Sequence, residues 1–386
     1  MNARNLKRVE AVAGPIAFID LQAQRTRLGG RIERAIARVL DHGIFVLGPE
    51  VAELERALAA FSGAAHAVTC ANGTDALQLA LMSEGIGRGD AVLLPSFNFT
   101  AAAEAVVLAG AEPVFVDVGA RDFNIDPASV AATLDRLAAE GGPRPRMVVA
   151  VDMFGQPADY AALAGIAGRH GLKLLADAAQ SFGAVRDGRR VGTLGQLTTV
   201  SFYPAKPLGC YGDGGAVLTD DAERAALLRS LRLHGQGTDK YDHPRVGMNS
   251  RLDTLQAAIL IEKLQIFAEE IEARQRVAER YDSGLAGCVA VPAIAPGVRS
   301  VWAQYTVISE RRDRIVAALR EDGIPTAIHY PLPLHRQLCY AGCRTAPGGL
   351  PVSERLARQV VSLPMHAYLE PETQDRIIAA VQAALA

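Results

Sequence analysis

The sequence predicts an α/β fold, with a large domain built on a mostly parallel seven-stranded sheet and a smaller C-terminal α/β domain. Short apolar segments alternate with helical segments from about residue 64 to residue 231, as they do in strand–helix–strand units. The length of 386 residues suggests two or three domains. A content of 49% hydrophobic and 21% charged residues excludes a disordered chain.

Two helices are expected before the alternating region. Apolar residues recur at helical spacing over residues 28–41 and again after Pro49, so we expect N-terminal helices within residues 28–61. A loop bracketed by glycines, residues 42–49, joins them. Residues 1–15 contain basic residues but no apolar segment after them, which predicts a loose N-terminal arm rather than a signal peptide.

The alternating region supplies the large sheet. Strands are expected at residues 67–70, 91–94, 113–116, 147–151, 172–176, 198–202 and 216–219. Helices are expected at residues 74–83, 100–109, 127–137, 160–170 and 222–231. Ligands of parallel sheets gather at the carboxyl ends of the strands, so we expect the chemistry there.

The remaining residues predict a long helix and a small domain. The helix is expected over residues 252–281, followed by a strand at 305–308 and helices at 313–321 and 372–385. We therefore expect an N-terminal arm (1–15), a large domain (16–250), and a linking helix with the small domain (251–386).

Charge and cysteine content exclude several classes of function. The net charge of −2 argues against nucleic acid or a membrane surface as the main partner. No apolar run approaches the roughly 20 residues of a membrane span. Five cysteines without a Cys-x-x-Cys pair argue against zinc or disulfides and for a cytoplasmic protein. No metal site is expected, because His329 and His335 have poor spacing for one.

Lysine is scarce in this sequence. Five of the 40 basic residues are lysines: Lys7, Lys173, Lys206, Lys240 and Lys263. A GC-rich coding bias explains the scarcity without any function. Under such a bias a lysine in an unusual place is notable, because only a lysine amine can form a Schiff base.

Three segments carry candidate chemistry. Gly73 and Thr74 begin a helix after a strand, where free N–H groups bind phosphate, although a plain capped helix has the same pattern. Asp177 ends an apolar strand, where a charge needs a partner unless it only caps the next helix. Ser201 precedes a turn that presents Lys206 between two prolines; the alternative is a solvated surface turn.

These segments together predict a pyridoxal phosphate site. A phosphate anchor, a carboxylate for the pyridinium nitrogen and a Schiff-base lysine are what that cofactor requires. The sequence contains no P-loop, no His-Glu-x-x-His and no Gly-x-Gly-x-x-Gly after a strand.

The chain resembles the DegT/DnrJ/EryC1/StrS family of pyridoxal phosphate-dependent sugar aminotransferases. The resemblance covers about residues 18–385 and is carried by residues 71–76, 177–181, 201–206 and 212–215. It implies the fold-type I aminotransferase architecture and a homodimer with shared active sites.

The resemblance also implies a role for each matched residue. Lys206 would form the Schiff base and move a proton, Asp177 would pair with the pyridinium nitrogen, and Gln180 would bond the ring hydroxyl. Phe99 would stack on the cofactor ring. The phosphate would be held by residues of both subunits: Gly73, Thr74 and Ser201 of one and Asn249 of the other.

The chain resembles more closely still the members that make UDP-2,3-diacetamido uronic acids for bacterial surface polysaccharide. That similarity is carried by residues 18–21, 42–43, 47–51, 181–184, 206–211, 246–253 and 327–331. It implies sugar-nucleotide contacts from Gly43, Arg251, His329 and Tyr330. The chain departs from the group at Phe45, where a tyrosine is expected, at Ala205, where a serine is expected, and at Ala367, where a proline is usual.

The expected reaction is transamination. L-Glutamate would donate the amino group, and UDP-2-acetamido-2-deoxy-3-oxo-glucuronate would receive it at C3. A neutral 3- or 4-keto nucleotide hexose is the alternative acceptor. A related pyridoxal phosphate dehydratase is disfavoured because histidine commonly replaces the lysine there, and a non-catalytic pyridoxal phosphate-binding regulator would not need Lys206, Asp177 and Gln180 together.

Overall fold

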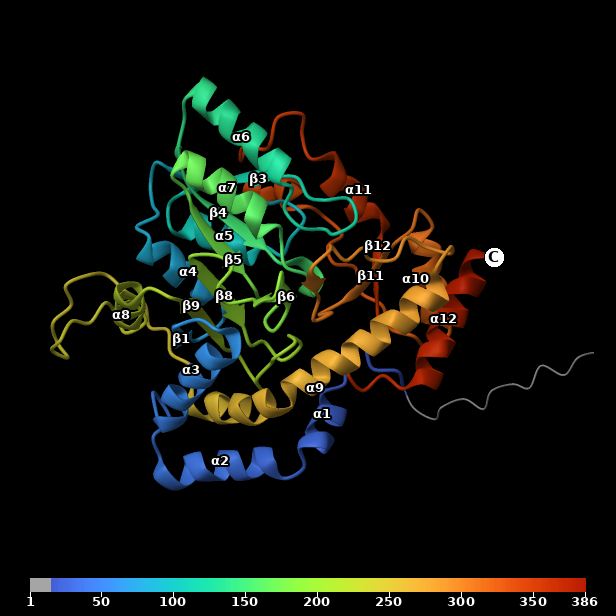
Figure 1. Ribbon diagram of the computed structural model, residues 1–386, viewed down its shortest axis with the longest axis horizontal. Helices are drawn as coiled ribbons and strands as arrows, with labels where there is room; N and C mark the ends of the chain where they lie inside the picture. Colours follow the sequence, from blue (N-terminus) through green and yellow to red (C-terminus); the bar gives the residue numbers. More distant parts are fainter. Residues whose placement is uncertain (1–14) are drawn as a thin grey trace, which may run out of the picture.

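A seven-stranded sheet forms the centre of the protein, whose computed structural model describes residues 15–386 (Figure 1). The expected N-terminal arm lies outside the described residues, apart from Pro15. The strands are β1 (His66–Cys70), β2 (Asp90–Pro95), β3 (Glu112–Val116), β4 (Arg144–Val151), β5 (Lys173–Asp177), β8 (Leu197–Ser201) and β9 (Gly215–Thr219). Their order is β1-β9-β8-β5-β4-β2-β3, and only β9 pairs antiparallel with its neighbours. The predicted mostly parallel seven-stranded sheet is confirmed.

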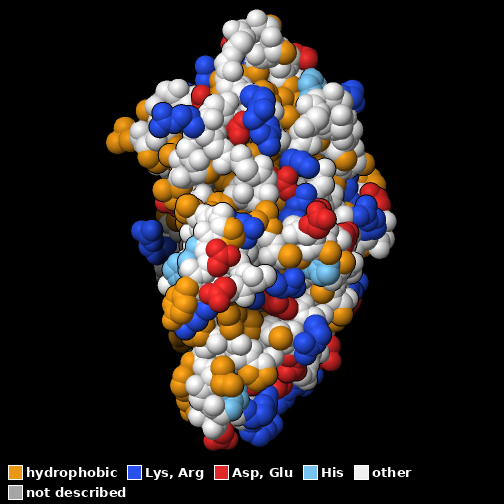
Figure 2. All heavy atoms as spheres, turned by 90° about the vertical axis from the view of Figure 1, so that its left-hand side faces the viewer, with side chains coloured by type: hydrophobic (Ala, Val, Ile, Leu, Met, Phe, Trp, Pro, Cys, Tyr) orange, Lys and Arg blue, Asp and Glu red, His pale blue; other side chains and the backbone are white. Residues whose placement is uncertain are grey.

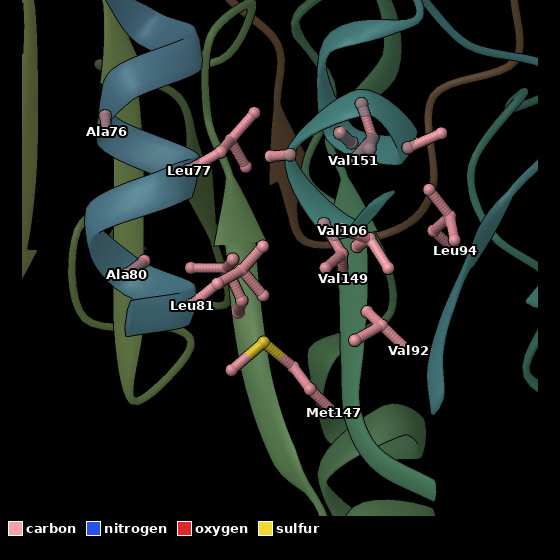
Figure 3. Packing of buried hydrophobic residues seen from close by; sticks show 14 of the residues in the cluster. Ala76, Leu77, Ala80, Leu81, Val92, Leu94, Val106, Met147, Val149 and Val151 are labelled. Atoms are coloured by element: carbon pink, nitrogen blue, oxygen red, sulfur yellow. The ribbon is translucent and has the colours of Figure 1, made fainter. Parts of the chain in front are cut away.

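Helices cover both faces of the sheet. One face packs against α4 (Gly73–Ser83), α5 (Ala101–Leu108) and α8 (Ala222–Leu231). Figure 3 shows this face, where Leu77 and Leu81 of α4 lie towards Val149 and Met147 of β4. The opposite face packs against α6 (Pro127–Glu140) and α7 (Tyr160–His170), and further along against α3 (Pro49–Ser62) and α9 (Thr254–Leu285). Successive strand residues alternate between the faces, so Val92 faces α4 while Ala91 faces α6.

The N-terminal region differs from the prediction. A separate helix α1 (Leu21–Leu28) precedes α2 (Arg31–His42), and the glycine pair 29–30 divides them. The Asp20 carboxylate caps α1 by accepting a hydrogen bond from the Ala23 N–H at 2.8 Å. Helix α1 was missed because its sequence is mostly polar and shows no apolar periodicity.

Helix α9 runs from the large sheet to a second core (Figure 1). Its first half contributes Leu260 and Phe267 to the large-sheet core, and its second half contributes Tyr281 to a core around β11 (Tyr305–Ile308) and β12 (Val360–Leu363). Helices α10 (Arg312–Glu321) and α12 (Pro371–Leu385) cover this two-stranded antiparallel sheet. The boundary expected near residue 250 stays a prediction.

Several short elements were not predicted. They are α11 (Pro351–Gln359), strand β12, the 3-10 turns η1 (Met153–Gly155), η2 (Leu334–Arg336) and η3 (Leu338–Tyr340), and a small sheet of β6 (Val185–Arg186), β7 (Arg189–Arg190) and β10 (Val298–Arg299). The segment between β11 and β12 returns to the large sheet, where Leu334 and Leu356 join its core. The small sheet and the turns are too short to give a periodic sequence pattern.

The surface matches the balanced charge. Acidic and basic side chains are interspersed on the face shown in Figure 2. Within residues 15–386, no helix combines the length and the apolar character needed to span a membrane.

Candidate active site

Lys206 lies in a compact loop between β8 and β9. The loop is closed at its base by the Phe202 N–H, which donates to the Gly214 carbonyl, and by the Cys210 N–H, which donates to the Phe202 carbonyl, each at 2.8 Å. Within it the Lys206 N–H donates to the Tyr203 carbonyl at 2.8 Å, which forms a tight turn. The Lys206 side chain is half-buried.

Asp177 is buried at the carboxyl end of β5, next to β8 in the sheet. Burial raises the pKa of its carboxyl group, and the Ala179 N–H and the Lys206 ammonium oppose that shift. Burial also lowers the pKa of Lys206, against the effect of Asp177. Within the described chain the Asp177 carboxylate accepts one hydrogen bond, from the Ala179 N–H at 3.1 Å, and neither it nor Lys206 has an ion-pair partner. Both charged groups are therefore available to a ligand.

Gln180 has an orientation that the main chain determines. Its Oε1 accepts a hydrogen bond from the Phe154 N–H at 2.8 Å, which directs Nε2 to the other side. That Nε2 makes only a long contact of 3.4 Å with the Tyr330 hydroxyl, so it remains a donor for another oxygen. The Tyr330 ring lies 6.2 Å from the half-exposed Phe99 ring. Gln180, Tyr330 and Phe99 are thus brought together from three distant segments.

The start of α4 forms a cradle with the end of β8. Gly73 and Thr74 are the first two residues of α4, and their N–H groups have no partner inside the helix. A Cβ atom on Gly73 would lie 2.6 Å from Ser201 Cβ, so a side chain would not fit there. We name Gly73, Thr74 and Ser201 the phosphate cradle.

His329 and Ala205 also lie beside Lys206. Burial lowers the pKa of His329, and the Lys206 ammonium lowers it further. The His329 Nδ1 lies 3.1 Å from Ser362 Oγ of β12. Ala205 is half-buried in the Lys206 turn itself, where it offers no hydrogen-bonding group.

Four predicted site residues come from two other segments of the chain; we name them the rim residues: Gly43, Phe45, Asn249 and Arg251. The Phe45 carbonyl accepts a hydrogen bond from the Thr254 N–H at 2.9 Å, which ties the two rim segments together. Gly43, Phe45 and Asn249 are exposed, and Arg251 is half-buried. Within the described residues no hydrogen bond or ion pair joins a rim residue to Lys206, Asp177 or Gln180.

Two buried polar contacts were missed by the sequence reasoning. Ser250, between Asn249 and Arg251, donates to Asp75 in the first turn of α4 at 2.6 Å and links the rim to the helix that begins in the phosphate cradle. Asp152 follows β4 and accepts hydrogen bonds from Ser181 Oγ at 2.6 Å and from the Ala158 N–H at 2.9 Å. The pattern that identified Asp177, an apolar strand ending in a carboxylate, also describes Asp152.

Pyridoxal phosphate fits these residues. Asp177 can pair with a ring nitrogen, Gln180 Nε2 can donate to a ring oxygen, and Lys206 can bind an aldehyde. The phosphate cradle offers main-chain N–H groups and a serine hydroxyl to an anion. Among residues 15–386, no cluster of three or more His, Cys, Asp or Glu side chains could hold a metal ion.

Comparisons with known proteins agree with this fit. Residues 27–382 match the DegT/DnrJ/EryC1/StrS aminotransferase family. The UDP-2-acetamido-2-deoxy-3-oxo-D-glucuronate aminotransferase of Pseudomonas aeruginosa is 47% identical over 95% of this chain and 99% of its own. The dTDP-3-amino-3,4,6-trideoxy-alpha-D-glucose transaminase of Streptomyces venezuelae is 44% identical over 95% of each chain.

A solved structure extends the agreement to the fold. The crystal structure of a DegT/DnrJ/EryC1/StrS aminotransferase from Brucella abortus has a TM-score of 0.95 at 50% identity and covers 96% of this chain and 99% of its own. The fold-type I architecture implied by the sequence is confirmed. Members of the family depend on pyridoxal phosphate. The chain belongs to the DegT/DnrJ/EryC1/StrS aminotransferase family.

Proposed function

We propose that this aminotransferase moves an amino group from L-glutamate to C3 of UDP-2-acetamido-2-deoxy-3-oxo-glucuronate, giving a 3-amino sugar for surface polysaccharide. The observation that carries the acceptor is the 47% identity with the Pseudomonas aeruginosa enzyme over nearly all of both chains. The chemistry is supported by Lys206, Asp177 and Gln180, which meet at the carboxyl ends of neighbouring strands.

Bound pyridoxal phosphate supplies an aldehyde that accepts the amino group and a ring that stabilises negative charge. Lys206 Nζ would hold the aldehyde carbon covalently and, once released, would move a proton between substrate and cofactor carbons. A lowered pKa suits this amine, because a neutral lysine is both nucleophile and base. The Asp177 carboxylate would hold the proton on the ring nitrogen, and Gln180 Nε2, directed by the Phe154 N–H, would donate to the ring hydroxyl.

The remaining residues orient the ligands. The phosphate cradle anchors one end of the cofactor, with the Ser201 hydroxyl free to donate because its only recorded contact in the described chain is a long 3.4 Å one from the Tyr203 N–H. Phe99 would stack on the cofactor ring, and Tyr330, whose ring lies 6.2 Å from that of Phe99, would contact the substrate. His329, beside the Lys206 turn, is proposed to contact the sugar nucleotide.

We further propose that two copies of the chain share their sites. The rim segment exposes three consecutive apolar side chains, Ile44, Phe45 and Val46, each about half exposed at 50%, 47% and 48%. Such a run on a loop is costly unless another surface covers it. A second copy that covers this segment would receive Gly43, Phe45 and Asn249 at its own active site.

Arg251 supports an acidic acceptor. It is half-buried and has no carboxylate partner among the described residues, so it suits a substrate carboxylate or a diphosphate. Phe45 and Ala205 stand where a tyrosine and a serine are expected, so they offer no hydroxyl to the sugar. Arg251 is then the main polar contact that the rim residues would make with the sugar. The cytoplasmic location stays a prediction; the five cysteines, all within the described residues, are free thiols.

A visible absorbance titration tests the reaction. L-Glutamate should bleach the cofactor band, and the UDP-linked 3-keto uronate should restore it. Restoration only by the neutral UDP-linked 3-keto sugar or by a dTDP-linked keto hexose would support the alternative acceptor. Absence of a band after pyridoxal phosphate is added would contradict the site assignment, and a band that glutamate never bleaches would favour a regulator.

An Arg251→Gln variant then separates the two roles of the guanidinium. Loss of a charged hydrogen bond to the substrate costs about 2–5 kcal/mol. If Arg251 binds the uronate carboxylate, kcat/KM should fall at least about 30-fold for the uronate and little for the neutral sugar. An equal fall for both acceptors would assign the guanidinium to the diphosphate instead.

A further inference from the structure

Lys263 is a buried lysine outside the active-site group. It lies on α9, and its side chain is fully buried. Its Nζ donates to the Gly209 carbonyl at 2.7 Å and lies 4.1 Å from the centre of the Tyr211 ring. Within the described residues it forms no ion pair, although burial of an ammonium group is costly. One carbonyl and one aromatic face therefore hold a cation inside the protein.

The partners of Lys263 belong to the loop that carries Lys206. A Cβ atom on Gly209 would lie 2.4 Å from the Pro204 carbonyl oxygen and 2.6 Å from that of Tyr203, so the backbone of Gly209 packs directly on this peptide. The Tyr203 carbonyl in turn accepts the Lys206 N–H at 2.8 Å. The position of the Gly209 carbonyl therefore restricts where the Lys206 turn can lie, because the main-chain groups of the two segments are in direct contact.

Helix α9 contacts this loop at a second point. Gln256 lies seven residues before Lys263, on the same face of the helix. Its Oε1 accepts the Tyr211 N–H at 2.9 Å, and its Nε2 lies 3.4 Å from the Tyr211 carbonyl. Residues 209–211 are therefore held against α9 by two side chains, one of which is charged.

We propose that Lys263 is a positioning residue: it fixes the backbone of residues 203–211 so that the Lys206 amine stays directed at the cofactor. This inference rests on the role proposed for Lys206. Lys263 does not touch the cofactor or the substrate; it acts through Gly209. Because a displacement of about 1 Å in a reacting group can cost up to about 100-fold in rate, a small shift of this loop is enough to matter.

The test uses Lys263→Met, which keeps an unbranched apolar side chain one atom shorter than lysine but removes the charge and the donor. Lys240→Met is the matched control, because Lys240 also lies over a tyrosine ring, 5.5 Å from the centre of Tyr241, but on an exposed loop. Both proteins are loaded with pyridoxal phosphate. Bleaching by L-glutamate is followed in a single turnover, and the visible band is titrated against pH.

Lys263→Met should slow the glutamate half-reaction about 10- to 100-fold and shift the pH midpoint of the band. The phosphate cradle is untouched, so the Kd for pyridoxal phosphate should change less than about threefold. Lys240→Met should match the wild-type protein. A purely stabilising role would lower Tm but leave the rate and the band midpoint unchanged well below Tm, and that result would overturn the proposal.

A second variant decides the case in which Lys263→Met does not fold. Gln256→Leu removes the other α9 contact with the loop, and a shift of the band midpoint in the same direction is expected. An unchanged midpoint in a folded Gln256→Leu protein would overturn the proposal. Failure of the role proposed for Lys206 is distinguishable, because the wild-type protein itself would then show no covalent cofactor at Lys206. Failure of the proposed acceptor is also distinguishable, because it leaves the glutamate half-reaction of the wild-type protein intact.

Discussion

Gly73→Ala tests the phosphate cradle most directly. The new Cβ would lie 2.6 Å from Ser201 Cβ and 2.9 Å from Ser201 Oγ, whereas unstrained carbon atoms stay about 3.5–4.0 Å apart. Either the start of α4 or the end of β8 must shift. Overpacking of this kind costs about 1–3 kcal/mol. At 1.4 kcal/mol per tenfold change, the Kd for pyridoxal phosphate should rise roughly 5- to 150-fold.

The assay is a titration of apoprotein with pyridoxal phosphate, followed by the rate at saturating cofactor. Affinity should fall, whereas kcat should stay near the wild-type value, since Lys206 and Asp177 are unaltered. Gly168→Ala in α7 is the control, because its Cβ meets nothing within 4 Å and alanine favours the helix. Thermal unfolding of the apoproteins separates lost affinity from lost stability.

Gly73→Ala combined with a substitution of Ser201 shows whether the contact between the two Cβ atoms causes the loss of affinity. In the Ser201→Gly protein the nearest contact of the new Cβ becomes the Cα of residue 201 at 3.3 Å, so Gly73→Ala should raise the Kd for pyridoxal phosphate less than in the wild-type protein. In Ser201→Ala protein the 2.6 Å contact remains, and the full penalty should persist. Equal penalties in the two backgrounds, or wild-type affinity in Gly73→Ala alone, would refute the cradle.

Three further predictions follow. Lys206→Ala should abolish covalent attachment, seen by borohydride reduction and peptide mass, and lower activity at least about 100-fold; retained attachment would exclude Lys206. If two copies share their sites as proposed, mixing Lys206→Ala subunits with inactive Asn249→Ala subunits should restore about one quarter of wild-type activity. Half of the dimers would be mixed, and each of these would have one intact site; no recovery would argue against shared sites. Burial raises the pKa of Asp152 to about 7. Between about pH 4 and pH 7 the folded apoprotein therefore keeps a proton on this carboxyl group that the unfolded chain loses. The contribution of this group to the free energy of unfolding falls as the pH rises through that range. Urea unfolding of Asp152→Asn should lack that component of the pH slope, and identical slopes would contradict the assignment.

The fold was largely predictable because its elements are long or strongly patterned. The apolar strands and the helices that follow them carry their own periodicity, so their order and the α/β class could be inferred locally. Helix α1 and the sheet formed by β6, β7 and β10 could not, because a polar helix and two-residue strands leave no pattern. Strand β12 pairs with β11 across more than 50 residues of chain, a contact that only packing reveals.

The candidate site was predictable in chemistry but not in arrangement. Asp177 and Lys206 stood out because a carboxylate at the end of a buried strand and a rare lysine between prolines are unusual on physical grounds. Asp152 shows the same signal as Asp177, and the sequence does not tell which carboxylate faces the cofactor. The structure distinguishes them: the Asp152 carboxylate accepts hydrogen bonds from Ser181, Ala158 and Tyr160, whereas the Asp177 carboxylate accepts only one within the described chain.

The sequence by itself determined the fold class, the family and the cofactor, because each depends on residue types at fixed local spacing. Only the tertiary structure decided which distant groups meet. It placed Gln180 against Phe154, packed Gly73 on Ser201 and put Lys263 beneath the Lys206 loop. Lys263 and Lys240 are equally rare lysines in the sequence, yet one is fully buried and the other exposed. Burial and long-range contact depend on how the elements pack, and no local pattern records that packing.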